Sequence, residues 1–176
     1  MEPISGSSGP SGRSDALSLL DGRVRGAVGK RGWRDLSAPQ AEAIPPLLAG
    51  RHLVLIAPTG SGKTESAMLP VFDRLVREEG PGFRALYITP LRSLNRDILQ
   101  RMEWWCRELG ITVGVRHGDT PTSERRRQAL HPPHLLITTP ETLQAIFMGK
   151  VLRRHLAHVR HVIIDEIHEL AGSKRG

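Results

Sequence analysis

The sequence predicts an α/β fold in which helices cover both faces of a parallel sheet. The first observation is that short apolar runs alternate with longer segments of helical periodicity. The second is that most of these runs are continuously apolar, which is typical of strands buried on both faces. The turns that follow the strands are the expected ligand-binding positions, because such sheets bind ligands beyond the carboxyl ends of their strands. The predicted strands cover residues 53–56, 84–89, 111–115, 134–138 and 159–164.

Helical patterns fill the intervals between the predicted strands. Ser37 is an expected N-cap, and Gly50 and Gly110 are expected to end two of the helices. Pro45 and Pro46 are expected to kink or restart the helix that contains them. The predicted helices cover residues 15–30, 37–50, 66–77, 93–109, 121–130, 140–148 and 151–157.

Composition sets broad limits on the protein. A chain of 176 residues is about one domain, and its net charge is +7. The charge favours a polyanionic partner such as nucleic acid, but the arginine-rich composition is explained equally well by a GC-rich genome. The single cysteine, Cys106, excludes an intramolecular disulfide and is expected to be an unreactive part of an apolar helix face. The histidines show no metal-ligand spacing, so we expect no structural zinc.

The N-terminal segment, residues 1–14, is rich in Gly, Ser and Pro and is predicted to be flexible. It lacks the basic and apolar regions of a signal peptide. No apolar stretch of the chain approaches the ~20 residues that a membrane-spanning helix needs. We therefore expect a cytoplasmic protein without a membrane partner, whose single domain covers residues 15–176.

A glycine-rich loop joins the first predicted strand to a helix. Its sequence, from Ala57 to Thr64, is APTGSGKT. Backbone N–H groups of such a loop and the positive end of the helix dipole form a cradle for phosphate. In this cradle Lys63 is expected to reach the β- and γ-phosphates, and the Thr64 hydroxyl to bind Mg²⁺. Ala57 departs from the general pattern, which has glycine at that position.

An acidic pair, Asp165 and Glu166, ends the last predicted strand. Nucleotide hydrolysis requires a carboxylate on the Mg²⁺ ion and a group that orients the attacking water. We predict the first role for Asp165 and the second for Glu166. Carboxylates are also common at ordinary helix N-termini, but this pair follows a phosphate loop in the same predicted sheet.

With these two motifs in place, the chain resembles superfamily 2 helicases of the DExH-box type. The resemblance covers residues 33–176 and five motifs in the family's order. Alanine at the position of Ala57 is usual in these helicases. The tail after the acidic pair and the segment from Thr139 to Gln144 are most similar to the large helicase-related (Lhr-like) branch. The five motifs are LSAPQ at 36–40, APTGSGKT at 57–64, YITPLRSL at 87–94, TTPET at 138–142 and DEIH at 165–168.

The resemblance implies a RecA-like P-loop NTPase domain that hydrolyses Mg-ATP while moving along single-stranded DNA, RNA or a DNA–RNA hybrid. His168 joins Lys63, Asp165 and Glu166 as an expected catalytic residue, and Gln40 is expected to hydrogen-bond the adenine edge. The Mg²⁺ ligands are expected to be Thr64 and Asp165. The expected ATP-binding residues are Gln40, Pro58, Thr59, Gly60, Ser61, Gly62, Lys63 and Thr64.

Two turns that open helices, at residues 90–92 and 139–141, are predicted to contact nucleic acid, because N–H groups and hydroxyls at helix starts can bind phosphates. A third turn, Gly118-Asp119, resembles a less specific turn of the helicase family that also approaches the nucleic-acid backbone. Arg92 is the best single candidate, although a solvated arginine at a helix start is the alternative. The neighbouring cations Arg125, Arg126 and Arg127 are expected to form a solvated helix face. The predicted nucleic-acid-binding residues are Pro90, Leu91, Arg92, Gly118, Asp119, Thr139, Pro140 and Glu141.

Members of this helicase superfamily continue with a strand that carries motif III and with a second RecA-like domain. That strand normally inserts between the strands with motifs I and II. We therefore expect residues 1–176 to be an N-terminal fragment, truncated before the motif III strand and inactive alone because the arginine finger is missing. Two other classes stay open: a non-hydrolytic nucleotide- and nucleic-acid-binding module, and a P-loop kinase or transporter ATPase. The sequence does not decide polarity, the preference for DNA or RNA, or oligomeric state.

Overall fold

The computed structural model describes residues 15–58 and 60–171. The predicted flexible segment 1–14 and the residues after Ala171 lie outside this range. The chain divides into two compact units, an N-terminal unit (Met1–Arg77) and a C-terminal unit (Glu78–Gly176). In the described part of the chain, no helix combines the length and apolar character that crossing a membrane requires.

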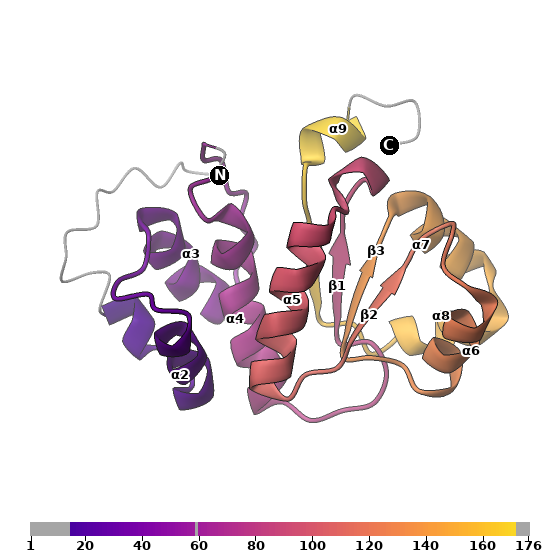
Figure 1. Cartoon of the computed structure of the whole chain (residues 1–176), viewed down its shortest axis with the longest axis horizontal. Coiled ribbons are helices and arrows are strands. Elements are labelled where there is room, and N and C mark those ends of the chain that lie inside the picture. The colour runs from indigo at the N-terminus through magenta and orange to yellow at the C-terminus, as the bar shows by residue number, and fades with distance from the viewer. Residues whose placement is uncertain (1–14, 59, 172–176) are drawn as a thin grey trace. The chain divides into compact units, whose positions relative to one another are not determined.

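The described part of the N-terminal unit is helical (Figure 1). A helical turn at residues 15–18 precedes α2 (Gly22–Lys30), so the predicted helix 15–30 is divided. The division follows from Asp21, whose side chain accepts a hydrogen bond from the backbone N of Arg23 and caps α2. Asp73, only 2% exposed, also accepts a hydrogen bond from the Asp21 backbone N–H, which fixes the start of α2 against α4 (Lys63–Arg77).

Helix α3 (Ala38–Leu48) packs against α4, and Ile44 of α3 and Met68 and Phe72 of α4 are fully buried. Of the two predicted effects of Pro45 and Pro46, a restart of the helix does not occur, since α3 is continuous; a kink stays a prediction. Both prolines lie inside α3, where each removes one backbone hydrogen bond because proline has no N–H, yet the helix continues to Leu48.

The predicted strand at residues 53–56 is wrong, because this segment has no regular secondary structure. Val54 is 53% exposed and Ile56 is 91% exposed. Strand formation requires a neighbour that takes up the backbone hydrogen bonds, and no described segment pairs with these residues. The apolar pattern of the segment does not specify a hydrogen-bonding partner, which is why it misled the prediction.

The C-terminal unit is built on a four-stranded parallel sheet in the order β2-β3-β1-β4. It confirms the other four predicted strands and the α/β fold class. The strands are β1 (Ala85–Ile88), β2 (Val113–Arg116), β3 (Leu135–Thr138) and β4 (His161–Ile164). The helical segments are the 3-10 turn η1 (Leu91–Ser93), α5 (Arg96–Leu109), α6 (Thr122–Leu130), α7 (Pro140–Met148), α8 (Lys150–Leu156) and α9 (Ile167–Ala171).

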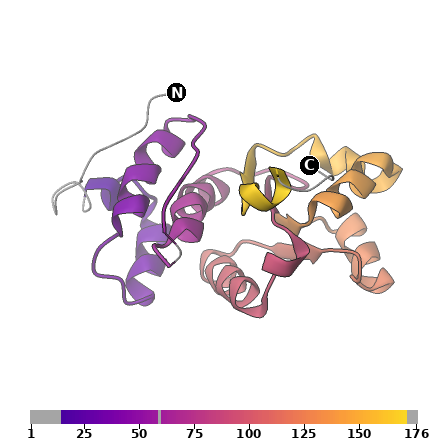
Figure 2. The same ribbon diagram turned by 90° about the horizontal axis from the view of Figure 1, so that it is seen from above.

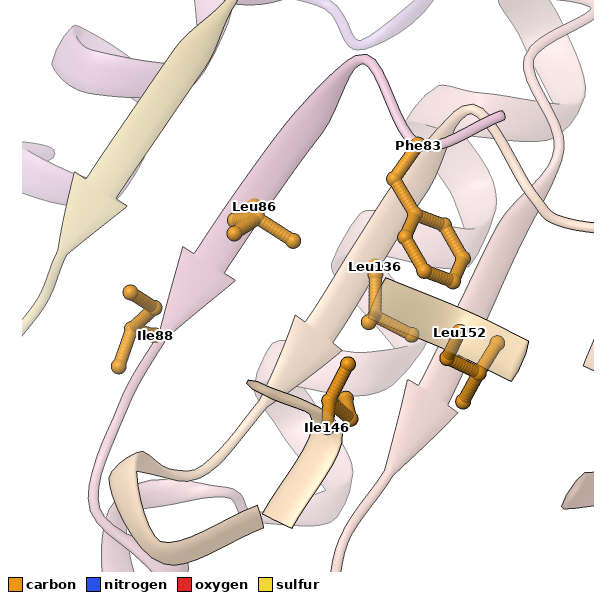
Figure 3. Packing of buried hydrophobic residues seen from close by; sticks show 6 residues of the cluster. All are labelled: Phe83, Leu86, Ile88, Leu136, Ile146 and Leu152. Atoms are coloured by element: carbon orange, nitrogen blue, oxygen red, sulfur yellow. The ribbon is translucent and has the colours of Figure 1, made fainter. Parts of the chain in front are cut away.

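Helices of the C-terminal unit lie on both faces of this sheet. Ile146 of α7 and Leu152 of α8 pack against Leu86 and Leu136 on one face (Figure 3). Helix α5 lies on the opposite side of the sheet (Figure 2). Burial raises the pKa of the Cys106 thiol on α5 to about 12, which agrees with the expected lack of reactivity.

Strand β4 forms one edge of the sheet, since β1 is its neighbour on one side and no described strand pairs with the other. Val162 and Ile164, which project from one face of β4, are 53% and 50% exposed, so the described residues cover this face of β4 only in part. The carboxyl ends of all four strands point the same way, so the turns after β1, β2, β3 and β4 gather at one end of the strands, which is called the carboxyl edge of the sheet below (Figure 1).

Candidate nucleotide and nucleic-acid sites

The phosphate loop of the N-terminal unit leads directly into α4, which begins at Lys63. Gly60 and Gly62 have φ values of 80° and 87°, the left-handed region that favours glycine. A Cβ atom on Gly62 would lie 2.8 Å from Gln40 Nε2. Position 62 thus requires glycine for its backbone conformation and for its close neighbour. Thr59, a predicted ATP-binding residue, lies outside the described residues.

The lysine and hydroxyl groups of the loop are arranged as a phosphate site requires. Lys63 Nζ donates hydrogen bonds to Ala57 O (2.7 Å) and Pro58 O (3.0 Å), so its ammonium group lies over the loop. Ser61 Oγ is buried, and the described residues provide no hydrogen-bond partner for it. A buried hydroxyl without a partner is costly, and a phosphate oxygen would satisfy it. The loop therefore fits a nucleotide phosphate.

Ser37 and Gln40 connect the start of α3 to this loop. The Ser37 backbone N–H donates to Gln40 Oε1 (2.9 Å), and Ser37 Oγ donates to Ser61 O (3.1 Å). Gln40 is 4% exposed. The amide predicted to read adenine is thus also a helix-capping group that adjoins the loop, and adenine contact stays a prediction. The pattern Ser-x-x-Gln, a capping-box sequence, is the signal for this contact.

The acidic pair follows β4 in the C-terminal unit. The Asp165 backbone N–H donates to Ile88 O (2.8 Å), which extends the pairing of β4 with β1 by one residue. Asp165 Oδ1 accepts from the Glu166 backbone N–H (3.0 Å), and Oδ2 accepts from the Tyr87 hydroxyl. Each oxygen of the Asp165 carboxylate therefore accepts a hydrogen bond that fixes its position.

Glu166 has a φ of 50°, the one positive value at a non-glycine residue among those described. Such a backbone conformation is unfavourable for a residue with a side chain and is frequent at functional sites. The His168 side chain is 75% exposed, and its Nδ1 lies 3.4 Å from Glu166 Oε2. The structure thus brings three predicted catalytic residues together: Asp165, Glu166 and His168.

Thr64 and Asp165, the predicted Mg²⁺ ligands, belong to different units. Their hydroxyl and carboxylate oxygens are the ligand types that Mg²⁺ binds, together with phosphate and water. Their joint role as ligands stays a prediction. Thr64 is half-buried in the first turn of α4.

The three turns predicted to bind nucleic acid all occur at the carboxyl edge of the sheet. Pro90 precedes η1, which contains Leu91 (52% exposed) and Arg92. Arg92 Nε donates to Glu169 Oε2 of α9 (2.5 Å), and this hydrogen bond raises the pKa of the Arg92 guanidinium. Arg92 is therefore exposed but paired with a carboxylate, which the sequence did not indicate.

The other two turns are stabilised by their own side chains. Thr139 caps α7 by accepting from Thr142 N (3.3 Å), with Pro140 as the first helical residue and Glu141 exposed in the first turn. At the turn after β2, Gly118 and the Asp119 side chain are exposed. The accessibility of Gly118 and Asp119 is compatible with the predicted phosphate contacts, whereas Thr139 is only 3% exposed.

Arg125 corrects one prediction. It is half-buried, and its guanidinium donates to Thr120 O (2.7 Å) and Gly118 O. The expected solvated face therefore describes Arg126 and Arg127, which are exposed, but not Arg125. Arg125 stabilises the turn that contains Gly118 and Asp119.

Comparison with known proteins agrees with this geometry. The family model "DEAD/DEAH box helicase" matches residues 37–176. The ATP-dependent helicase Lhr-Core of Sulfolobus acidocaldarius is 38% identical over 175 residues, which cover 92% of this chain and 20% of that protein. The Lhr helicase/uracil glycosylase of Escherichia coli is 37% identical, and 83% of this chain covers 11% of it. The chain thus spans a fifth or less of the length of these relatives.

A solved structure of Mycobacterium smegmatis Lhr bound to ssDNA and AMP-PNP matches with a TM-score of 0.80 and 35% identity, covering 91% of this chain and 22% of that one. The DEAD-box helicase Mss116, at 22% identity and a TM-score of 0.80, shows the shared RecA-like fold. Together these matches argue against the kinase or transporter alternative. The chain belongs to the DEAD/DEAH box helicase family, and its similarity to Lhr helicases confirms the predicted branch.

Proposed function

We propose that this chain is the first motor domain of an ATP-dependent helicase that moves along single-stranded nucleic acid. The observation that carries the proposal is the phosphate loop, in which Gly60 and Gly62 adopt left-handed conformations and the buried Ser61 hydroxyl has no partner among the described residues. The relatives' names support helicase activity, and the share of their length that the chain covers supports its being one part of a larger motor.

In this proposal each polar group of the two motifs has one task. Lys63 exchanges its hydrogen bonds with Ala57 O and Pro58 O for bonds to the β- and γ-phosphates. Thr64 and Asp165 hold Mg²⁺, which supplies charge neutralisation on the phosphate oxygens. Glu166 orients and deprotonates the attacking water, and His168 contacts Glu166.

Nucleic acid binds at the carboxyl edge of the sheet in the C-terminal unit. Each of the η1, Gly118 and Thr139 turns has exposed residues there, although Thr139 itself is buried. Backbone N–H groups and hydroxyls of turns bind phosphates without reading sequence. We propose single-stranded DNA or RNA as the partner, because one relative of known structure, Mycobacterium smegmatis Lhr, is bound to ssDNA.

The test is ATP hydrolysis by the full-length protein that contains this chain, with and without single-stranded DNA or RNA. Lys63→Ala is expected to lose nucleotide binding, whereas Glu166→Gln is expected to bind ATP and lose turnover. Lys150→Ala, at an exposed position on α8, is the matched control and should keep wild-type turnover. Normal hydrolysis by either motif variant would refute the proposed mechanism. Nucleotide binding without any hydrolysis in the wild type would favour the non-hydrolytic module instead.

A further inference from the structure

Tyr87 lies on the same face of the sheet as Asp165, the first residue of the acidic pair. It is paired in register with Ile163 of β4, and it is 1% exposed. Side chains alternate along a strand, so Tyr87, Ile163 and Asp165 project from one face. Asp165 is one residue beyond the end of β4. A side chain on β1 needs the length of tyrosine and a terminal donor to reach its carboxylate.

The hydrogen bonds of the Asp165 carboxylate leave a lone pair on each of its oxygens for a metal ion. The Tyr87 hydroxyl donates to Asp165 Oδ2, and the Glu166 backbone N–H donates to Oδ1. Each carboxylate oxygen has two lone pairs, so each keeps one after these hydrogen bonds. With the Asp165 backbone N–H bound to Ile88 O, the residue is fixed at its main chain and at both side-chain oxygens.

We propose that Tyr87 is a positioning residue for Mg²⁺ binding, which fixes the Asp165 carboxylate in the orientation that the metal requires. The inference rests on the proposed function, in which Asp165 is a metal ligand. Outer hydrogen-bond partners of metal ligands orient the ligand and tune its basicity. A phenylalanine would fill the same buried space and leave Asp165 Oδ2 without this donor.

The first experiment compares Tyr87→Phe with wild type in the full-length protein that contains this chain. The affinity for a fluorescent AMP-PNP analogue is measured with and without Mg²⁺. We expect the enhancement by Mg²⁺ to fall by about tenfold or more, as is typical when such an outer partner is removed, while the affinity without Mg²⁺ stays unchanged. An unchanged Mg²⁺ enhancement would overturn the inference.

Thr112→Val is the matched control. It also removes one hydroxyl, which accepts a hydrogen bond from His134 N (3.0 Å) at the opposite edge of the same sheet. Its Mg²⁺ enhancement should equal that of wild type even if its melting temperature falls. An equal loss in both variants would show a general effect on the sheet and would overturn the specific role of Tyr87.

A double-mutant cycle separates positioning through Asp165 from a merely structural role. In the Asp165→Asn background, Tyr87→Phe should cause no further loss of Mg²⁺ enhancement, because the group that Tyr87 orients has already lost its charge. Additive losses would overturn the inference. If wild type itself shows no Mg²⁺-dependent nucleotide binding, the proposed function fails as well, and this outcome differs from failure of the Tyr87 role alone.

A spectroscopic measurement needs no substitution of Tyr87. Site-specific incorporation of fluorotyrosine at position 87 of the full-length protein that contains this chain gives one ¹⁹F resonance that reports on this hydroxyl. Addition of Mg²⁺ with ADP should shift the resonance in wild type and leave it unmoved in Asp165→Asn. A shift of equal size in both proteins would contradict the proposal.

Discussion

The phosphate loop and the turn after β4 both contain left-handed backbone, but they reach it at different cost. In the loop the residues concerned are glycines, Gly60 and Gly62, which adopt such conformations freely. In the turn the residue is Glu166, for which a left-handed conformation costs roughly 1–2 kcal/mol. Because glycine has no carboxylate, the cost at position 166 is consistent with a chemical requirement there.

The two turns are also held by different means. Side chains of α3 hold the loop, since Ser37 Oγ binds Ser61 O and Gln40 lies against Gly62. The sheet holds the acidic turn, through the hydrogen bond between Asp165 N and Ile88 O. Substitutions in the loop should therefore alter its conformation, whereas substitutions in the acidic turn should alter chemistry more than conformation.

Gly62→Ala is expected to have the largest effect. Its Cβ would overlap Gln40 Nε2 at 2.8 Å, and Gln40 is buried and bound to Ser37 N, so moving it breaks the cap of α3. If strain and overlap together cost about 3 kcal/mol, the affinity for Mg-ATP falls on the order of 100-fold. Isothermal titration with AMP-PNP and Mg²⁺ measures this loss.

Gly60→Ala is the matched control for Gly62→Ala. Its φ is also left-handed, at 80°, but a Cβ atom there meets nothing within 4 Å. Only the backbone strain remains, about 1 kcal/mol. Equal losses of affinity in the two variants would show that the contact with Gln40 does not matter.

Glu166→Gly tests the cost of the acidic turn and should raise the free energy of unfolding by a small amount. Relief of the left-handed conformation outweighs the added chain entropy of glycine, so unfolding should cost about 0.5 kcal/mol more. ATP turnover should be lost at the same time. Glu166→Gln, which keeps the strained backbone, should lose turnover with no gain in the free energy of unfolding measured by urea denaturation. A less stable glycine variant would mean that the conformation at position 166 is not strained.

The sheet was predictable because its strands are marked locally, and their neighbours are present in the same unit. Residues 84–89 and 134–138 form β1 and β3 with small changes in their ends. Residues 53–56 have the same pattern and form no strand, because pairing depends on a partner that a local pattern does not specify.

The features of the candidate sites also differ in how far the sequence predicted them. The phosphate loop and the acidic pair were found because each is a short contiguous motif. The contacts of Tyr87 with Asp165 and of Arg92 with Glu169 join residues 78 and 77 positions apart. Such contacts follow from strand register, which the sequence pattern left open. Tyr87 could be connected to Asp165 only once β1 and β4 were known to be neighbours.

The smallest expected effect is a change in stability with pH, and this change differs between the two units. Burial lowers the pKa of His134, whose Nδ1 accepts from Thr112 N (3.1 Å) in the C-terminal unit. The unfolded chain therefore binds protons at His134 more readily, so the stability of this unit falls as pH drops below the unfolded pKa of about 6.5. Hydrogen bonding from Arg23 lowers the pKa of Asp21 in the N-terminal unit to about 2. Its contribution is complete above the unfolded pKa of about 3.9 and is lost only as pH falls toward 2.

Between pH 7 and pH 5 the two units should therefore respond differently. Amide hydrogen exchange, corrected for the intrinsic pH dependence of exchange, should show weaker protection of β2 and β3 at pH 5 and unchanged protection of α2. His134→Asn, which keeps an acceptor near Thr112 N but does not titrate in this range, should remove the pH dependence of β2 and β3. A loss of protection that begins in α2 within this window would contradict the assignment, because Asp21 keeps its charge throughout it.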